Sequence, residues 1–238
     1  MNASSLVSAS SLACNYGVKS IVYGPPGTGK TPIIATCPRP LLLACETGLG
    51  SLQSLGAHIP VWPALTSARI NEFFSWFFSS AEARNFDTLC IDSASQMCEI
   101  KLNEELPGKK DPRQAYGEME RWGTPIFNGL YYMQQKHIYI ICKEEPVEES
   151  TGSGPNKNVV YRYRPYFPGK ALTRNVRHLY DLIMRVENTS LPAFTQAGIT
   201  RVFRTLGNST VEARDRFGKL AELEPTNFTH IINKCMAA

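Results

Sequence analysis

Near its N-terminus the chain contains the sequence Ser20-Ile21-Val22-Tyr23-Gly24-Pro25-Pro26-Gly27-Thr28-Gly29-Lys30-Thr31. Its last eight residues match the pattern G-x-x-x-x-G-K-[ST] completely, and an apolar, β-branched run precedes them. In such a loop the glycines let the backbone turn, so that successive N–H groups face the phosphates of a nucleotide. The stretch therefore predicts a buried strand, a phosphate-binding loop and a helical segment, in that order.

Every residue of this loop is a candidate nucleotide ligand: Gly24, Pro25, Pro26, Gly27, Thr28, Gly29, Lys30 and Thr31. We expect Lys30 to reach the β and γ phosphates and to assist catalysis, and the Thr31 hydroxyl to ligate Mg²⁺. The N-terminus of the following helix would add partial positive charge, and Pro32 is tolerated in a first helical turn. ATP and Mg²⁺ are thus the predicted cofactors; an incidental Gly-rich turn is the alternative interpretation.

Two carboxylates follow apolar runs elsewhere in the chain. Asp92 ends the run that begins at Phe86, which is where the second magnesium carboxylate of a P-loop site is expected, although it could instead only cap the next helix. The residue after it is Ser93, so the usual adjacent glutamate is missing. Glu46 follows the run Leu41–Cys45 and is the alternative catalytic base; the competing interpretation is a solvated loop residue.

Apolar runs alternate with helical patterns in the first half of the chain. Spacings of three and four residues between apolar positions predict helices over Ile70–Phe78, from Ser93 or Ser95 to about Leu106, and over Tyr116–Gln135. The predicted strands are Lys19–Tyr23, Leu41–Cys45, His58–Trp62, Phe86–Ile91 and Ile138–Cys142. This alternation predicts an α/β fold, with a mostly parallel sheet flanked by helices on both faces.

The second half of the chain is richer in β-forming residues. Glu144–Pro155 holds four glutamates and a Gly/Pro-rich turn, which predicts a mobile loop. Further strands are expected over Val159–Phe167, Tyr180–Glu187 and Ile199–Leu206, with a closing helix over Asn227–Cys235. We therefore expect residues 1–16 to form a flexible tail and residues 17–238 a single domain with a β-rich C-terminal half.

The amino-acid composition indicates which class of protein this chain belongs to. The 238 residues are 43% hydrophobic and 19% charged, which supports a buried core. The seven cysteines show no C-x-x-C spacing and are expected as buried thiols in a reducing compartment. No apolar run approaches the roughly 20 residues of a membrane span, and residues 1–12 hold no basic residue, which argues against a secretory signal. We expect a soluble protein without a membrane partner.

Several segments together resemble the phage-encoded RecA-like single-strand annealing ATPases. They are Ser20–Thr31, Arg39–Leu43, Glu46–Leu49, Asp111–Gly117, Phe167–Lys170 and Ala213–Gly218, and the resemblance covers about residues 17–235. It implies a RecA-like P-loop NTPase core, ATP-dependent binding of single-stranded DNA, and a role in phage recombination in the cytoplasm of an infected bacterial host. It also implies a homo-oligomer, either filament or ring, with a single-strand DNA-binding protein as a further candidate partner.

One position departs from this pattern. The polar sensor that follows the next strand is Lys143, and Glu144 and Glu145 come after it. A lysine there could contact the γ-phosphate as a catalytic residue, or could merely pair with a glutamate. This departure affects the expected rate of ATP hydrolysis and leaves the expectation of nucleotide binding unchanged.

The resemblance to RecA-like proteins implies that two loops approach DNA, at about Pro107–Gly117 and Glu144–Lys170. Residues 157–219 carry 12 basic and 4 acidic side chains, in keeping with a polyanion surface. In an extended segment the tyrosines at 161 and 163 share one face and the arginines at 162 and 164 the other; the alternative is a hairpin with its aromatics packed inward. The DNA-binding candidates are Lys109, Lys110, Arg113, Tyr161, Arg162, Tyr163, Arg164, Lys170 and Arg174.

Some of the basic residues have a second interpretation, because Lys170, Arg174 and Arg177 could instead reach the phosphates held by a neighbouring subunit. The predicted function is an ATP- and Mg²⁺-dependent recombination protein that binds single-stranded DNA and promotes annealing or strand pairing. A hexameric helicase or helicase loader of the same fold is one alternative. A regulatory ATP-binding switch that acts on a protein partner is the other.

Overall fold

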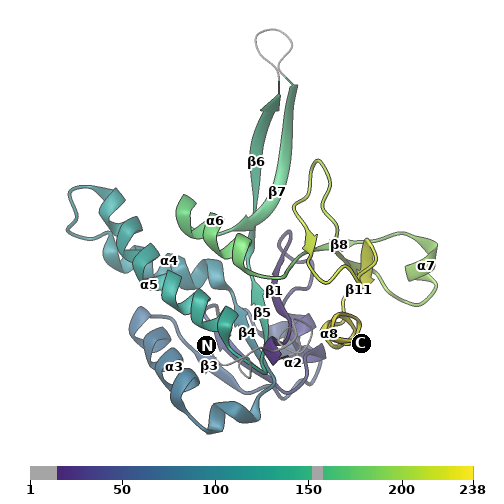
Figure 1. Ribbon diagram of the computed structural model, residues 1–238, viewed down its shortest axis with the longest axis horizontal. Helices are drawn as coiled ribbons and strands as arrows, with labels where there is room; N and C mark the ends of the chain where they lie inside the picture. Colours follow the sequence, from purple (N-terminus) through teal and green to yellow (C-terminus); the bar gives the residue numbers. More distant parts are fainter. Residues whose placement is uncertain (1–14, 152–157, 238) are drawn as a thin grey trace, which may run out of the picture.

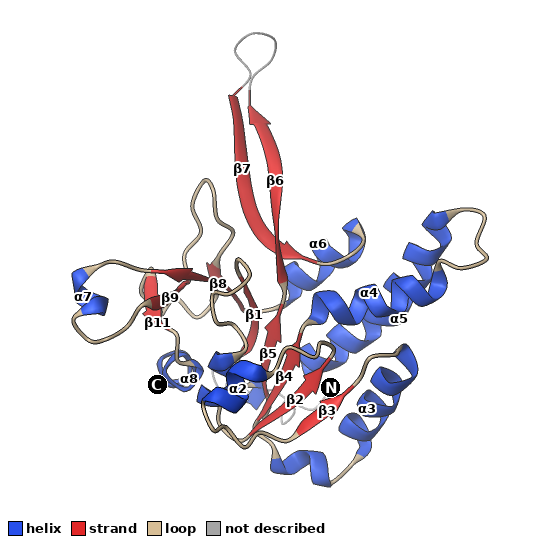
Figure 2. Cartoon of the chain, turned by 180° about the vertical axis from the view of Figure 1, so that it is seen from behind, coloured by secondary structure: helices blue, strands red, loops and turns tan. Residues whose placement is uncertain are grey.

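A mostly parallel sheet forms the centre of the computed structural model, which describes residues 15–151 and 158–237 (Figures 1 and 2). Within this part of the chain the parallel strands lie in the order β8-β1-β5-β4-β2-β3. Their bounds are Lys19–Tyr23 for β1, Pro40–Ala44 for β2, Val61–Pro63 for β3, Thr88–Asp92 for β4, His137–Ile141 for β5 and Leu182–Asn188 for β8. Because these strands are parallel, their carboxyl ends meet at one edge of the sheet.

The C-terminal part extends this sheet with antiparallel strands. Strand β9 pairs with β8, β11 pairs with β9, and β10 pairs with β8. A separate antiparallel hairpin of β6 and β7 leaves the end of β5 and projects away from the sheet (Figure 1). The bounds are Lys143–Thr151 for β6, Asn158–Tyr166 for β7, Arg201–Arg204 for β9, Arg214–Asp215 for β10 and Leu223–Pro225 for β11. The predicted β-rich C-terminal half is confirmed.

Helices cover both faces of the sheet. Helices α3, α4, α5 and α6 pack on one face, and η2, α2 and α8 on the other. Their bounds are Pro32–Thr36 for η2, Gly50–Ser54 for α2, Ser67–Ser79 for α3, Ala94–Glu105 for α4, Pro112–Tyr132 for α5, Lys170–Leu179 for α6 and Phe228–Met236 for α8; the short η3 (Glu82–Asn85) and α7 (Pro192–Thr195) lie in connections. The predicted α/β class is confirmed.

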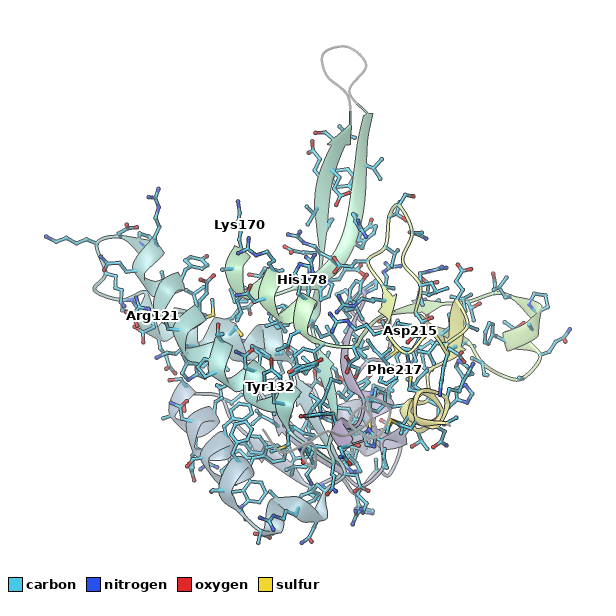
Figure 3. The ribbon with its side chains drawn as sticks, in the orientation of Figure 1. Arg121, Tyr132, Lys170, His178, Asp215 and Phe217 are labelled. Atoms are coloured by element: carbon cyan, nitrogen blue, oxygen red, sulfur yellow. The ribbon has the colours of Figure 1, made fainter. Side chains whose placement is uncertain are left out.

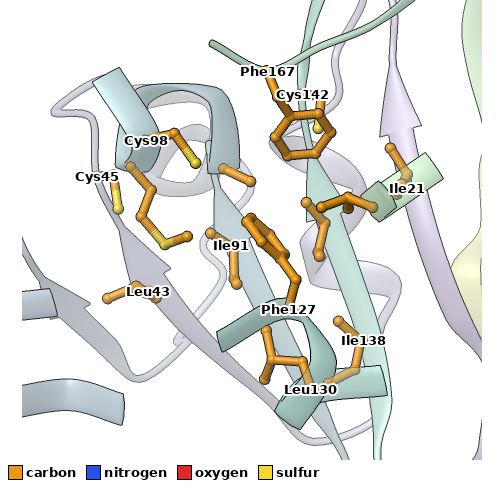
Figure 4. Packing of buried hydrophobic residues seen from close by; sticks show 14 of the residues in the cluster. Ile21, Leu43, Cys45, Ile91, Cys98, Phe127, Leu130, Ile138, Cys142 and Phe167 are labelled. Carbon is orange, nitrogen blue, oxygen red and sulfur yellow. The ribbon is translucent and has the colours of Figure 1, made fainter. Parts of the chain in front are cut away.

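The central strands are buried on both faces, as continuous apolar runs require in such a fold. All five residues of β1 and of β4 are buried. Alternate side chains enter two separate cores: Ile21 and Ile91 join the cluster under α5, whereas Val22 lies in the cluster under α8. In the first cluster, Phe127 of α5 lies over the sheet (Figure 4).

The cysteines that the structure describes are buried thiols, as the sequence predicts. Within the described residues the six cysteines are free and buried, and burial raises the pKa of the Cys45 thiol to about 12. None of the helices in residues 15–151 and 158–237 is both long enough and apolar enough to cross a membrane. Most of the predicted tail falls outside the described residues.

Two segments differ from the sequence prediction for physical reasons. The segment predicted as a mobile loop, Glu144–Pro155, forms part of strand β6 as far as Thr151, and its remaining residues lie outside the described ranges. Three of its glutamates pair with arginines of other strands, for example Glu145 with Arg164 at 2.7 Å, so charge does not prevent strand formation. Helix α5 begins at Pro112 rather than Tyr116, because Asp111 caps it and proline is favourable in a first turn.

Candidate functional site

The phosphate loop joins β1 to η2 at the carboxyl edge of the sheet. Gly24 lies so close to β8 that an added Cβ would be 2.6 Å from the carbonyl oxygen of Val186, and its positive φ of 149° also favours glycine. The Lys30 ammonium donates hydrogen bonds to the carbonyl oxygens of Gly24 and Pro25, both at 2.8 Å. Burial lowers the pKa of Lys30, while Asp92 acts most strongly among the carboxylates that oppose this. The ammonium is therefore held over the loop.

The helix after the loop is shorter than the motif predicts. It is the five-residue 3₁₀ helix η2, which begins at Pro32 and ends before Cys37 takes an extended conformation. Pro38 follows directly, and a residue before proline is biased away from the helical region. Because the dipole of so short a helix is small, phosphate binding would rest on the loop N–H groups and Lys30. The expected contribution from a helix N-terminus is thus corrected.

Thr31 and Asp92 meet although their strands are not neighbours. Strand β5 lies between β1 and β4, yet the Thr31 hydroxyl donates to Asp92 Oδ2 at 2.6 Å. Asp92 is buried, and burial raises the pKa of its carboxyl to about 6 against the opposing effect of the Thr31 hydrogen bond. Hydroxyl and carboxylate oxygens are the ligands that Mg²⁺ prefers, so this pair fits the predicted metal site.

Glu46 lies beside the end of the Asp92 strand. Strands β2 and β4 are paired so that Ala44 is opposite Asp92, and this register brings Glu46 to the same edge. The Ser93 hydroxyl donates a hydrogen bond to Glu46 Oε1 and accepts one from the Gln96 N–H at 3.2 Å, which caps α4. The Glu46 side chain is thus oriented, while the residue remains exposed to solvent. A base that activates water needs this accessibility.

Lys143 adopts the second of its two predicted arrangements. Its ammonium donates to Gln96 Oε1 at 2.9 Å and pairs with the Glu99 carboxylate, both on α4. Its backbone N–H donates to the Ser95 hydroxyl at 2.9 Å. In this structure Lys143 fixes the start of the hairpin to α4, so its role as a catalytic contact to phosphate is not part of the observed geometry.

A large groove lies between the hairpin, the start of α5 and helix α6. Its volume is about 1190 Å³. Basic side chains line it from three elements, and Lys170 and His178 mark the α6 side beside the hairpin (Figure 3). The DNA-binding candidates that line it are Arg113, Arg164, Lys170 and Arg174. Residues predicted from two separate loops are therefore brought to one surface.

The charges in this groove are only partly compensated. Arg164 pairs with Glu145 at 2.7 Å, and Arg177 pairs with Glu212 at 2.8 Å. The side chains of Arg113, Lys170 and Arg174 make no hydrogen bond or ion pair with any residue that the structure describes, and all three residues are exposed. An exposed set of unpaired cations favours a polyanionic ligand.

The two faces of the hairpin correct part of the aromatic prediction. Arg164 and Tyr166 face the groove, so the intervening alternation places Tyr163 on the opposite face. There the Tyr163 ring lies 5.1 Å below the Arg185 guanidinium and packs against the core. Tyr163 is therefore a structural residue. Tyr161 shares its face but is 55% exposed.

The remaining candidates lie outside the groove. Arg162 makes a 3.8 Å ion pair with Glu149 on the neighbouring strand. Lys109 pairs with Glu105 at 3.1 Å, whereas Lys110 is exposed and has no ion pair with a described residue. Neither lysine is among the groove residues, so the first predicted DNA loop reaches the groove through Arg113.

One aromatic residue of the groove, Tyr116, was missed as a candidate, whereas Tyr166 belongs to the second predicted DNA loop. Tyr116 of α5 and Tyr166 of β7 both line the groove, and Tyr116 is among the causes, after burial and Glu99, that raise the pKa of Tyr166. The available signal was Asp111-Pro112, because a cap followed by proline starts the helix early enough to place Tyr116 in its second turn. The groove thus combines cations with aromatic rings.

Comparison with known proteins identifies the family. No curated protein matches the chain in sequence. Among solved structures, the flagellar accessory protein FlaH from Methanocaldococcus jannaschii is 11% identical, with 80% of this chain and 78% of that chain covered and a TM-score of 0.39. The model of one family, described as "AAA domain", matches residues 16–217, which is most of the chain. The chain therefore belongs to the AAA-domain family of P-loop NTPases.

Proposed function

We propose that this P-loop ATPase binds single-stranded DNA in an ATP- and Mg²⁺-dependent manner and promotes annealing or strand pairing in phage DNA recombination. The observation that carries the proposal is the groove between the hairpin, α5 and α6. It joins unpaired cations to two tyrosines beside the nucleotide edge of the sheet. The phage setting rests on the sequence resemblance alone.

The composition of the groove favours single strands. Sequence-tolerant single-strand binding combines cations that hold phosphates with aromatic rings on which bases stack. Arg113, Lys170 and Arg174 supply the first ingredient, and Tyr116 and Tyr166 the second. A base-paired duplex keeps its bases stacked inside, where these tyrosines could not reach them, so an unpaired strand is the better match.

The nucleotide site and the groove share an element, which supports a dependence on ATP. Strand β5 leaves the sheet edge and continues into β6 after one residue. Burial lowers the pKa of Lys30, and the charge of Glu144 of β6 is among those that oppose this; Glu144 also pairs with Arg185 at 2.7 Å. A triphosphate at Lys30 would add negative charge next to Glu144. The repulsion would act on the base of the hairpin, and ATP would thereby favour one hairpin position.

The reaction itself would use the residues at the strand ends. When bound, Mg²⁺ supplies charge stabilisation at the phosphates, and Thr31 and Asp92 would hold it. Lys30 would exchange its backbone carbonyl partners for phosphate oxygens. Glu46 would take a proton from the attacking water, with the Ser93 hydroxyl keeping its carboxylate in place. ATP hydrolysis would then return the protein to the conformation of lower DNA affinity.

The test combines binding with imaging. Fluorescence anisotropy of a labelled oligothymidine, with and without a non-hydrolysable ATP analogue and Mg²⁺, should show at least about tenfold tighter binding with the analogue. Electron microscopy of the same mixture should show a protein filament or ring on the DNA. Nucleotide binding without any single-strand affinity would contradict the proposal and favour a regulatory switch. Directional unwinding of a forked duplex would favour a helicase.

A further inference from the structure

A basic side chain from outside the motif lies on the phosphate loop. Arg201 is the first residue of β9 and lies opposite Asn188 at the end of β8. A Cβ atom added to Gly29 would be 2.2 Å from Arg201 Nη1 and 3.0 Å from its Cζ. The guanidinium therefore covers the loop backbone one residue before Lys30.

Among the described residues, no carboxylate forms an ion pair with the guanidinium of this arginine. Arg201 is exposed, and its side chain makes no hydrogen bond or ion pair with residues 15–151 or 158–237. Arg204 on the same strand provides the contrast, because it pairs with Glu187 at 2.8 Å and also with Glu222. An unpaired guanidinium and the Lys30 ammonium thus occupy the same loop, an arrangement that an anion between them would stabilise.

Open space adjoins the guanidinium. A cavity of about 370 Å³ is lined by Arg201, by Thr200 before it and by Thr226 and Asn227, and no carboxylate lines it. Asn227 caps α8, and the start of α8 is fastened to η2 because the Phe228 N–H donates to Thr36 Oγ1 at 2.8 Å. The cavity therefore lies beside Arg201, next to a helix that packs on the segment after the phosphate loop.

We propose that Arg201 binds the phosphate chain of the nucleotide in cis, from the same chain that supplies the phosphate loop. A planar guanidinium presents paired N–H donors that match phosphate oxygens. The cavity beside it leaves room for the nucleoside. The inference rests on nucleotide binding at Lys30 and is independent of DNA.

Three variants test the charge and its position. We expect Arg201→Ala to weaken the binding of Mg²⁺-ATP by about tenfold, and Arg201→Lys by about threefold because the charge is kept without the paired donors. Arg121→Ala is the matched control, since Arg121 is an exposed arginine on α5 with a side chain 75% exposed. Affinity is measured by displacement of a fluorescent ATP analogue. Melting curves without nucleotide should coincide for all variants.

Inorganic tripolyphosphate as the displacing ligand separates a phosphate contact from a nucleoside contact. The proposal requires Arg201→Ala to lose affinity for tripolyphosphate by the same factor as for ATP. An unchanged affinity for tripolyphosphate would overturn it, as would an unchanged affinity for ATP. If Lys30→Ala also binds ATP normally, the phosphate-loop assignment fails; if only Arg201→Ala does, that assignment stands and the inference about Arg201 fails.

Mixing two variants separates action in cis from action in trans. Lys30→Ala chains keep Arg201, and Arg201→Ala chains keep the loop. If Arg201 acts in trans, an equimolar mixture would contain subunit pairs with a complete site and would regain ATP affinity. The proposal predicts no gain over the average of the two variants, and restoration would overturn it.

Discussion

The strand-end site and the hairpin groove differ in how their polar side chains are satisfied. At the strand ends, Lys30 is bound to loop carbonyls, Thr31 to Asp92, and Ser93 to Glu46. In the groove, the side chains of Lys170 and Arg174 make no hydrogen bond or ion pair with a described residue. The first region is preorganised by its own contacts. The second carries charge that only a ligand can compensate.

This difference indicates which region of the molecule can change its position while the fold is kept. The strand-end residues lie at or beyond the carboxyl ends of β1, β2 and β4, and the side chains of these strands fill both cores. The hairpin meets the rest of the molecule at its base, where the Tyr23 hydroxyl donates to the carbonyl oxygen of Tyr163 at 3.0 Å. Variants at the strand ends should therefore change chemistry, and variants in the groove should change affinity for a large anion.

The largest effect is expected from Lys30→Ala, which would break the strand-end site. Losing a charge-assisted contact to the phosphates should weaken ATP binding by about 100-fold. Isothermal titration calorimetry measures the affinity, and circular dichroism checks the fold. Lys110→Ala removes an exposed lysine away from the loop and should leave ATP binding unchanged. Normal ATP affinity in a folded Lys30→Ala protein would refute the assignment of the site.

Glu46→Gln should separate binding from turnover within that site. Glutamine keeps an oxygen for the Ser93 hydroxyl but cannot accept the proton from water. Phosphate release should fall by about 100-fold, with ATP affinity within about threefold of the unmodified protein. Glu82→Gln, at an exposed position of η3, serves as the control. Turnover at the unmodified rate would show that another residue is the base.

Asp92→Asn should reveal the cost of the buried carboxylate. Burial raises the pKa of the Asp92 carboxyl to about 6 in the folded protein, which is above its pKa in the unfolded chain. The folded state therefore binds more protons than the unfolded state between about pH 4 and 6. As a result, the free energy of unfolding falls as the pH rises through that range. Above about pH 6 the variant should gain up to about 3 kcal/mol, and the gain should shrink towards pH 4. Nucleotide-free melting curves across pH measure this. A constant difference would contradict the burial argument.

Tyr163→Ala and Tyr166→Ala test whether two tyrosines on opposite faces of strand β7 have different roles. Tyr163 packs inward, so its loss should cost about 2 kcal/mol of stability, or a fall of roughly 4–8 °C in Tm. Tyr166 lines the groove, so its loss should cost about 1–3 kcal/mol of single-strand affinity. Melting curves and anisotropy are run on both variants. Equal effects of the two variants on DNA affinity would contradict the assigned faces.

The strand-end site was largely predictable from sequence because its signals are local. A complete loop motif follows an apolar strand, and Asp92 and Glu46 each end an apolar run. Parallel strands bring such ends to one edge, so the meeting of these residues needed no knowledge of the strand order. The short length of η2 was harder to predict, because it depends on Pro38, which lies beyond the end of the helix.

The groove was less predictable because it depends on distant partners. Four glutamates led to the prediction of a loop at β6, whereas arginines of β7 and β8 pair with three of them, Glu144, Glu145 and Glu149. Helix α6 was not expected, although Leu172 and Val176 are buried at a spacing of four residues. The contact between Arg201 and Gly29 joins residues that are far apart in the chain, so no local sequence pattern predicts it.

The most direct test of the account is the salt dependence of single-strand binding by an Arg113→Ala/Lys170→Ala/Arg174→Ala variant. With Mg²⁺ and a non-hydrolysable ATP analogue present, anisotropy titrations of labelled oligothymidine at several salt concentrations give the slope of log affinity against log salt. Three lost phosphate contacts should reduce this slope by about 2 and weaken binding at low salt by at least about 100-fold, with ATP affinity unchanged. Unchanged affinity and slope in the folded variant would contradict the claim that this groove binds DNA.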